Sequence, residues 1–377
     1  MSNIIVLGAG MVGSTMAIDM AKRHSVTLTD FNKSALDKAV KKCDKLTPIV
    51  LDVTQKETLQ KTIKPFDLVI CAVPGFLGFE TLKSIIEAEK NVIDISFFPE
   101  NSLELNELAK QKNVTAIVDC GVAPGMGNII LGYYNEKLNI TDFECLVGGL
   151  PKVKKWPFNY KAPFSPVDVI EEYTRVARYV ENGHVVVKEA LSDVEFVEFE
   201  GVGTLESFNS DGLRSIIHTM AHIPNMKEKT LRYPGHIEYI NVLKKSGFFN
   251  EEPILINGIS VSPLEFSSKI LFNEWKLGDE EPEITVMRIT VKGTGEKGIN
   301  KTFVYNLHDE FCPETKTSSM ARTTGYTATA AANLFLDGLF REKGIFPPEL
   351  VGKNEECFHY FLNYLKDRNV IYTKVEL

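Results

Sequence analysis

The first third of the chain alternates short apolar runs with amphipathic segments. The apolar runs have the length and composition of strands that are buried on both faces of a parallel sheet. Strand and helix patterns alternate roughly six times, which predicts a doubly wound parallel sheet of the α/β class. Thr54 and Glu57 have capping-box spacing, and residues 73–78 are expected to form a loop before the next helix. The expected strands are 4–7, 25–29, 47–51, 68–72, 92–94 and 115–118, and the expected helices include 14–22, 33–43, 54–63 and 102–111.

A different pattern begins after residue 122. Apolar and polar residues alternate at Phe143, Cys145 and Val147, as in strands with one buried face. Two alternating runs, 285–292 and 301–308, flank a glycine-rich turn that is typical of a hairpin. Together with helices this predicts a second, mixed α+β domain, and a length of 377 residues also suggests two domains. The expected helices are 126–134, 167–173, 212–221, 237–245, 263–275 and 327–339, with the regular pattern ending at 344–348.

Three glycines with G-x-G-x-x-G spacing follow the first apolar run and precede a helix. In such a turn, Gly8 permits the tight bend, Gly10 lets a pyrophosphate approach and Gly13 lets helix and strand pack closely. Asp30 ends the next apolar run, 17 residues after Gly13, where a carboxylate accepts from ribose hydroxyls and repels a 2′-phosphate. The sequence therefore predicts a dinucleotide site that takes NAD rather than NADP. The alternative is a glycine-rich turn of another α/β protein in which Asp30 caps a helix.

Composition excludes several classes of function. The net charge of −8 argues against a nucleic-acid partner. The six cysteines contain no C-x-x-C pair, which is typical of reduced thiols in a cytoplasmic protein. The apolar N-terminus has no preceding basic residues and is broken by glycines, so we do not expect a signal peptide. Since no apolar span approaches the ~18 residues of a membrane helix, we expect no membrane partner.

Polar groups near the strand ends are the candidates for chemistry. Asp119 ends a strand beside a second glycine-rich loop, although a turn or cap role is equally open. The turn of residues 230–236 carries Arg232, Tyr233 and His236, a mixture that suits recognition of an amino acid. An ordinary ion pair for Arg232 and a structural role for His236 are the alternatives. His218 and His222 lack the glutamate of H-E-x-x-H, and no metal site is expected.

Five motifs in order resemble the saccharopine dehydrogenase/reductase family, most closely its lysine 6-dehydrogenase branch. They are the first glycine turn with Asp30, the loop 119–125, residues 148–151, residues 229–236 and residues 320–325. The resemblance implies a Rossmann domain at residues 1–122 and a catalytic and dimerisation domain at 123–325. It also implies a C-terminal helical segment, 326–377, that returns to the first domain, and a homodimer.

The resemblance also assigns site residues. The substrate would be a small amino acid, oxidised at a C–N bond by hydride transfer to NAD, with Asp119 or His236 as the base. Arg232 and Tyr233 would lie on the substrate side. The cofactor contacts would be Gly8, Gly10, Met11, Val12, Gly13, Asp30, Asp52, Pro74, Gly121, Val122 and Pro124.

One departure from the family bears on the substrate. Saccharopine enzymes tend to carry Asn-Arg-Asp-Ser where this chain has residues 209–212, Asn-Ser-Asp-Gly, so an arginine for a substrate carboxylate is missing. Asp211 would repel a diacid and could receive an ammonium group, which favours L-lysine. The alternatives are a saccharopine dehydrogenase, an enzyme of the carboxynorspermidine dehydrogenase kind, and a non-catalytic NAD-binding regulator on the same fold.

Overall fold

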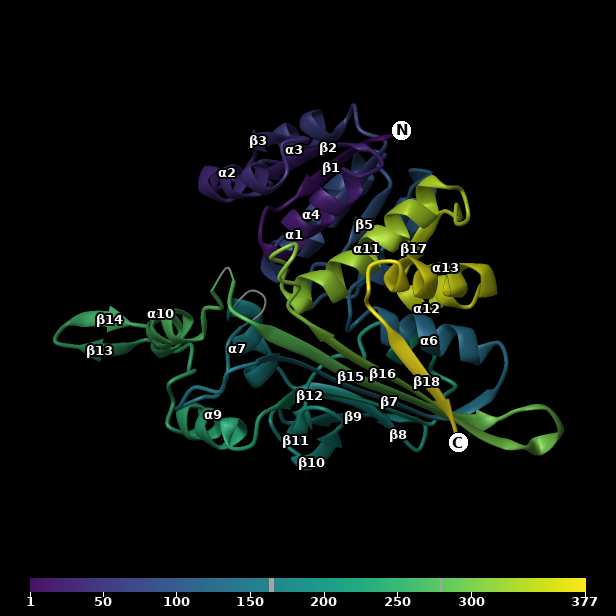
Figure 1. The fold of residues 1–377 in the computed structure, drawn as a ribbon. Helices are drawn as coiled ribbons and strands as arrows, with labels where there is room; N and C mark the ends of the chain where they lie inside the picture. The colour runs from purple at the N-terminus through teal and green to yellow at the C-terminus, as the bar shows by residue number, and fades with distance from the viewer. Residues whose placement is uncertain (163–165, 279) are drawn as a thin grey trace.

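The computed structural model describes residues 1–162, 166–278 and 280–377, and its described part is built on two large sheets (Figure 1). The N-terminal sheet has seven parallel strands in the order β17-β6-β5-β4-β1-β2-β3. Residues 4–7 of β1 are fully buried, as expected of a strand covered on both faces. The predicted doubly wound sheet is confirmed. Its strands are β1 (Asn3–Leu7), β2 (Ser25–Asp30), β3 (Leu46–Val50), β4 (Leu68–Cys71), β5 (Val92–Asp94), β6 (Thr115–Ile117) and β17 (Gly344–Phe346).

The helices of this half follow the predicted order with two corrections. Helix α3 begins at Lys56 without a side-chain cap, because the Thr54 hydroxyl donates to Asp52 Oδ1 (2.7 Å) instead. Helix α4 begins at Gly75, inside the segment expected to be a loop. The helices are α1 (Met11–Met20), α2 (Lys33–Lys42), α3 (Lys56–Ile63), α4 (Gly75–Glu87) and α5 (Asn106–Gln111), the last preceded by the 3-10 turn η1 (Ser102–Leu105).

The second sheet has nine strands and is mostly antiparallel, although β7 and β12 run parallel. The predicted hairpin is confirmed as β15 paired with β16. The sheet consists of β7 (Asn139–Pro151), β8 (Ala177–Glu181), β9 (His184–Lys188), β10 (Glu195–Phe199), β11 (Gly203–Asn209), β12 (Asn225–Arg232), β15 (Glu283–Thr294), β16 (Asn300–Glu310) and β18 (Tyr372–Glu376).

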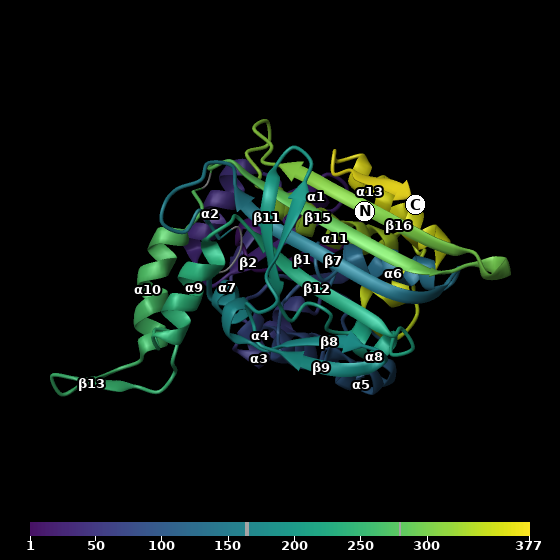
Figure 2. The ribbon, with the colours of Figure 1, turned by 90° about the horizontal axis from the view of Figure 1, so that it is seen from below.

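Helices α9 (His236–Lys245) and α10 (Pro263–Trp275) project from one end of this sheet with the hairpin β13 (Ile254–Ile256) and β14 (Ile259–Val261) (Figures 1 and 2). Ser262 caps α10 by accepting from Glu265 N, as its sequence predicts. The remaining helices of this half are α6 (Met126–Asn135), α7 (Pro166–Thr174) and α8 (Ile216–Thr219). The helix expected at 212–221 is therefore wrong over most of its length, because Arg214 adopts a left-handed conformation (φ 47°).

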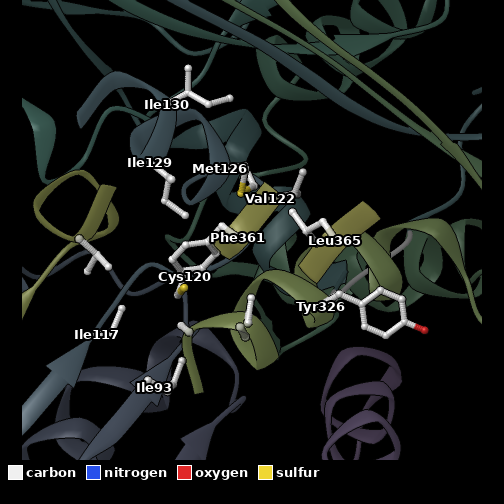
Figure 3. Packing of buried hydrophobic residues seen from close by; sticks show 14 of the residues in the cluster. Ile93, Ile117, Cys120, Val122, Met126, Ile129, Ile130, Tyr326, Phe361 and Leu365 are labelled. Carbon is white, nitrogen blue, oxygen red and sulfur yellow. The ribbon is translucent and has the colours of Figure 1, made fainter. Parts of the chain in front are cut away.

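The C-terminal part of the chain, from residue 319 on, contacts both sheets. Its helices are α11 (Ser319–Leu336), α12 (Pro348–Gly352) and α13 (Glu355–Lys366). The helix expected at 327–339 begins earlier, at Ser319, and ends at Leu336. The regular pattern does not end at 344–348, because β17 pairs with β6 and β18 pairs with β16. One apolar core spans the two sheets: Ile93 and Ile117 of the parallel sheet, Met126 of α6 and Phe361 of α13 share it (Figure 3).

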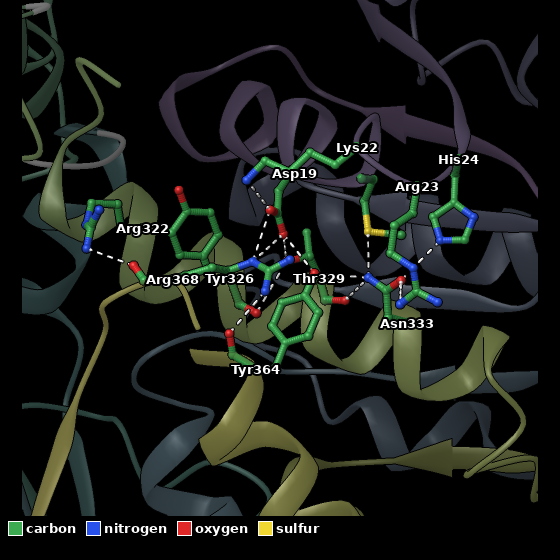
Figure 4. A network of polar contacts seen from close by, with 11 residues as sticks. Asp19, Lys22, Arg23, His24, Arg322, Tyr326, Thr329, Asn333, Tyr364 and Arg368 are labelled. Atoms are coloured by element: carbon green, nitrogen blue, oxygen red, sulfur yellow. Dashed lines mark hydrogen bonds and ion pairs between the residues drawn. The ribbon is translucent and has the colours of Figure 1, made fainter. Parts of the chain in front are cut away.

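A buried polar network fastens this segment to helix α1. The Asp19 carboxylate accepts hydrogen bonds from Thr329 (2.7 Å), Tyr364 (2.8 Å) and Arg368 (2.9 Å) (Figure 4). Asp19 is 3% exposed, so the arginine offsets the cost of burying its charge. The core and this network hold the parallel sheet against the second sheet.

Candidate active site

A cavity of about 730 Å³ lies beyond the carboxyl ends of the parallel strands, between them and the second sheet. Ligands of doubly wound sheets bind at this edge. Every residue that the family resemblance assigns to the cofactor lines the cavity: Gly8, Gly10, Met11, Val12, Gly13, Asp30, Asp52, Pro74, Gly121, Val122 and Pro124.

The first glycine turn forms a cradle that leaves space for a ligand. A Cβ on Gly13 would lie 2.1 Å from the Gly8 carbonyl oxygen, and a Cβ on Gly8 would lie 2.4 Å from the Ala72 oxygen. Gly10 faces open space, with nothing within 4 Å of a Cβ. Tight packing at two glycines and free space at the third are what a pyrophosphate at a helix N-terminus requires.

Asp30 is held in a fixed orientation at the end of the cradle. Its Oδ2 accepts from Ala9 N (2.7 Å) and its Oδ1 accepts from Asn32 N (2.8 Å). The next residue, Phe31, is 78% exposed and also lines the cavity, where it offers a flat apolar face. The residues present therefore fit a dinucleotide with its ribose at Asp30.

Asp119 stands at the inner part of the cavity with a partner that the sequence did not reveal. Arg214 donates from Nε to Asp119 Oδ1 (2.9 Å), and both side chains are almost fully buried. The Arg214 guanidinium also donates to the Phe98 carbonyl and lies over the Phe97 ring. Asp119 additionally borders a smaller cavity of about 90 Å³ behind it. The pair joins the parallel sheet to the second half of the chain.

His236 and Tyr233 lie outside the cavity lining, which corrects the expected grouping of the 230–236 turn. The His236 ring bonds to Phe158 O (2.9 Å) and Tyr173 Oη (2.9 Å), and it is 1% exposed. Burial, followed by the charge of Arg232, lowers the pKa of His236 to about 3, so its ring is neutral. The Tyr233 hydroxyl donates to the Pro151 carbonyl oxygen (3.1 Å), away from the cavity. Neither side chain reaches the cavity, so His236 is not placed to act as the base.

Arg232 and Asp211 do line the cavity, but each already has an ionic partner. Arg232 donates to Glu172 (2.9 Å) and to Tyr173 (3.2 Å) and is 2% exposed. Arg178 donates to both oxygens of Asp211 (2.9 and 2.8 Å). The expected repulsion between Asp211 and a diacid is therefore reduced by a neighbouring positive charge.

Two family models match the chain. One, described as the saccharopine dehydrogenase NADP binding domain, matches residues 4–117, and the other, the saccharopine dehydrogenase C-terminal domain, matches residues 121–371. The chain belongs to the saccharopine dehydrogenase family. The resemblance to this family, and its two-part fold, are thereby confirmed, and a nicotinamide cofactor follows.

Relatives within the family carry several names. The chain is 25% identical to bovine alpha-aminoadipic semialdehyde synthase over 98% of its own length but 47% of that protein, so it spans about half the length of that relative. It is 22% identical to the NADP(+), L-glutamate-forming saccharopine dehydrogenase of Saccharomyces cerevisiae, covering 99% of this chain and 98% of that one. Carboxynorspermidine synthase of Vibrio alginolyticus is 24% identical over 92% of this chain and 91% of its own.

Solved structures show the same fold. Apo saccharopine dehydrogenase (L-Glu forming) from Saccharomyces cerevisiae superposes with a TM-score of 0.80 at 19% identity and covers all of both chains. Homospermidine synthase from Legionella pneumophila, in complex with NAD, gives a TM-score of 0.69 at 13% identity and covers 100% of this chain and 91% of its own.

Three acids that sequence reasoning missed also line the cavity: Glu171 and Glu172 of α7, and Glu228 of β12. Glu228 lines the cavity from β12 and is 6% exposed. Glu228, Thr230 and Arg232 alternate along this strand and all line the cavity, so the period-two spacing was the available signal. In the described ranges no cluster of three or more metal-ligating side chains occurs, and no helix there is both long and apolar enough to cross a bilayer.

Proposed function

We propose that this chain is an NAD-dependent dehydrogenase acting on a C–N bond of a lysine-derived amino acid, with L-lysine as the best-suited substrate. The observation that carries this is a single cavity that runs from the glycine cradle to a wall rich in carboxylates. Five carboxylates and three cations line the wall. Arginines pair with four of the carboxylates, and the fifth, Glu228, is left for a substrate that brings an ammonium group. The acids are Asp119, Glu171, Glu172, Asp211 and Glu228, and the cations are Arg175, Arg232 and Lys276.

Asp30 supports NAD as the cofactor. Both of its oxygens are oriented by backbone N–H groups and retain lone pairs for ribose hydroxyls, while their charge opposes a 2′-phosphate. Several relatives are named for NADP(+), whereas the residue at this position of the chain favours NAD. When bound, an oxidised nicotinamide accepts hydride from the carbon next to the reacting nitrogen.

The cations of the wall suit a substrate with one carboxylate. Arg175 is paired with Glu171, and Arg232 with Glu172. Lys276 is exposed and has no ion pair with any residue that the structure describes. We therefore assign the substrate α-carboxylate to Lys276, with Arg232 as the second cation in reach of the cavity. A substrate with three carboxylates would leave two without a free partner, at a cost of roughly 1.5–3 kcal/mol for each charged contact.

A carboxylated polyamine is the second candidate. It also carries a single carboxylate, and its additional ammonium groups would meet the acids of the wall. The match to carboxynorspermidine synthase over nine-tenths of both chains supports this candidate.

The test is formation of NADH with NAD and, in turn, L-lysine, saccharopine and carboxynorspermidine. We expect turnover with lysine and none with saccharopine. Turnover of carboxynorspermidine without lysine would support the second candidate. Turnover of saccharopine alone would overturn both, and no turnover with any amine, despite NADH binding, would indicate a regulator.

A further inference from the structure

Four of the five carboxylates in the cavity wall are neutralised by arginines. Asp119 pairs with Arg214, Glu171 with Arg175, Glu172 with Arg232 and Asp211 with Arg178, so each acid has a partner from its own surroundings. The remaining acid, Glu228, makes no hydrogen bond or ion pair through its carboxyl group with any of the described residues. An almost buried carboxyl without a partner is costly in a folded protein unless a ligand or a proton satisfies it.

The fold holds Glu228 at one place in the cavity. Strand β12 is paired with β7 on one side, where Glu228 lies opposite Cys145. The Tyr179 hydroxyl of β8 donates to the Glu228 carbonyl oxygen and fixes the backbone. Gly212 covers the carboxyl group so closely that a Cβ there would lie 1.7 Å from Glu228 Oε1. The carboxyl group is therefore enclosed on the protein side and open toward the cavity.

We propose that the Glu228 carboxylate receives the reacting amine of the substrate and accepts its proton. This rests on the proposed function, because it assigns the base for oxidation of a C–N bond. Glu228 lines the same cavity as Asp119 and the second glycine loop, to which the resemblance assigns cofactor contacts. Asp119 then acts as a positioning residue, because Arg214 already occupies one of its oxygens.

The step balances in atoms and electrons. A proton moves from the substrate ammonium to a Glu228 oxygen and frees the nitrogen lone pair. The adjacent C–H bond breaks, its electron pair leaves as hydride to the oxidised nicotinamide, and the lone pair forms the C=N bond. The substrate loses two electrons, the nicotinamide gains two, and the proton on Glu228 is released to solvent.

The charged and titratable groups around Glu228 explain how it holds and releases this proton. Burial raises the pKa of Glu228 to about 8, and the nearby carboxylates of Glu172 on α7 and Asp211 before α8 add to this rise. The charge of Arg214 lowers the pKa, and that of Asp119 raises it. The Cys145 thiol across the strand pair has a raised pKa and stays neutral. Free enzyme below pH 8 therefore holds Glu228 protonated, and an incoming ammonium favours its carboxylate form.

The experiment compares Glu228→Gln with Glu206→Gln in the full chain. Glu206 is a matched control on β11, since it is also nearly buried with an unpaired oxygen but does not line the cavity. In wild type, kcat/KM for amine oxidation should rise with pH through about 8. Glu228→Gln should lower kcat about 10²–10⁴-fold and remove this rise, with NADH affinity unchanged. Glu206→Gln should keep the wild-type pH profile, and a wild-type profile in Glu228→Gln would overturn the proposal.

Infrared difference spectroscopy separates this proposal from the choice of substrate. NADH-loaded protein at pH 7 should show a protonated carboxyl band that is absent from Glu228→Gln. Adding an amine from the same three substrates should remove the band, even where no turnover occurs. If no amine removes it, the assignment of Glu228 fails whatever the substrate assay shows. If an amine removes it and none is oxidised, the proposed function fails and the amine site stands.

Discussion

The two ends of the cavity are built in different ways. At the cofactor end, backbone makes the shape: two of the three glycines between residues 8 and 13 have no room for a methyl group. At the substrate end, side chains from α7, β12 and the loop before α8 make the shape, and arginines hold four of five carboxylates. The first end should therefore be sensitive to added atoms and the second to unbalanced charge.

The largest effect is expected where a buried ion pair at the substrate end is broken. Arg232→Met would leave Glu172 without the guanidinium at 2.9 Å and remove a donor to Tyr173. Unfolding free energy should fall by about 3–5 kcal/mol, because an unpaired charge stays largely buried. Urea unfolding measures this loss.

The matched control removes both charges. Arg232→Met with Glu172→Met should recover most of the lost stability, since replacing a whole buried pair by apolar groups is often neutral. A double variant no more stable than Arg232→Met alone would show that packing of Arg232 against Tyr160, at 4.4 Å from the ring centre, matters more than its charge.

The same contrast explains what the sequence could predict. The first six strands of the parallel sheet and the cofactor end follow from local signals, because neighbouring residues encode these strands and the first glycine turn, although the starts of α3 and α4 differ from the prediction. Strands β17 and β18 were missed because they are short and pair with β6 and β16, far away in the chain. The helix expected at 212–221 failed at Arg214, whose left-handed backbone serves its ion pair with Asp119.

The substrate end was only partly predictable, because the tertiary fold decides which of its side chains reach the cavity and which are buried away from it. The sequence placed Arg232 and His236 on one turn, but Arg232 lines the cavity and His236 lies behind it. Alternation along β12 is a signal that could have grouped Glu228 with Arg232, yet nothing local shows which face of a strand meets a cavity. The arginine partners of Asp119 and Asp211 were equally hidden, since ion pairs between distant segments have no sequence spacing.

At the cofactor end, two alanine substitutions should separate packing from binding. Gly13→Ala places a Cβ 2.1 Å from the Gly8 oxygen, so α1 must move away from β1, and both stability and NADH binding should be lost. Gly10→Ala meets no protein atom within 4 Å and should fold like wild type. Its methyl group would occupy the pyrophosphate space, so NADH should bind at least a hundredfold more weakly, about 2.7 kcal/mol.

Thermal unfolding measures the change in stability of each variant, and NADH titration measures its cofactor affinity independently. Full NADH affinity in Gly10→Ala would show that the cofactor does not approach this turn, and would contradict the cradle. Wild-type stability in Gly13→Ala would contradict the close packing of helix on strand.

The smallest expected effect concerns the choice between NAD and NADP. Asp30 should make NADH bind at least tenfold more tightly than NADPH, about 1.4 kcal/mol, through acceptance from the ribose and repulsion of a 2′-phosphate. Asp30→Asn should narrow that ratio by removing the charge. Because Asn cannot accept from both Ala9 N and Asn32 N, affinity for both cofactors should also fall somewhat.

The ratio of the two affinities is therefore the readout, measured by fluorescence titration of each reduced cofactor. Lys33 is exposed three residues after Asp30 and is the group that could weaken the repulsion. Lys33→Met should widen the preference for NADH if the lysine attracts a 2′-phosphate, and should leave it unchanged if the lysine points to solvent. Equal binding of NADH and NADPH in both wild type and Lys33→Met would show that Asp30 does not select the cofactor, and that at this end of the cavity the backbone alone governs binding.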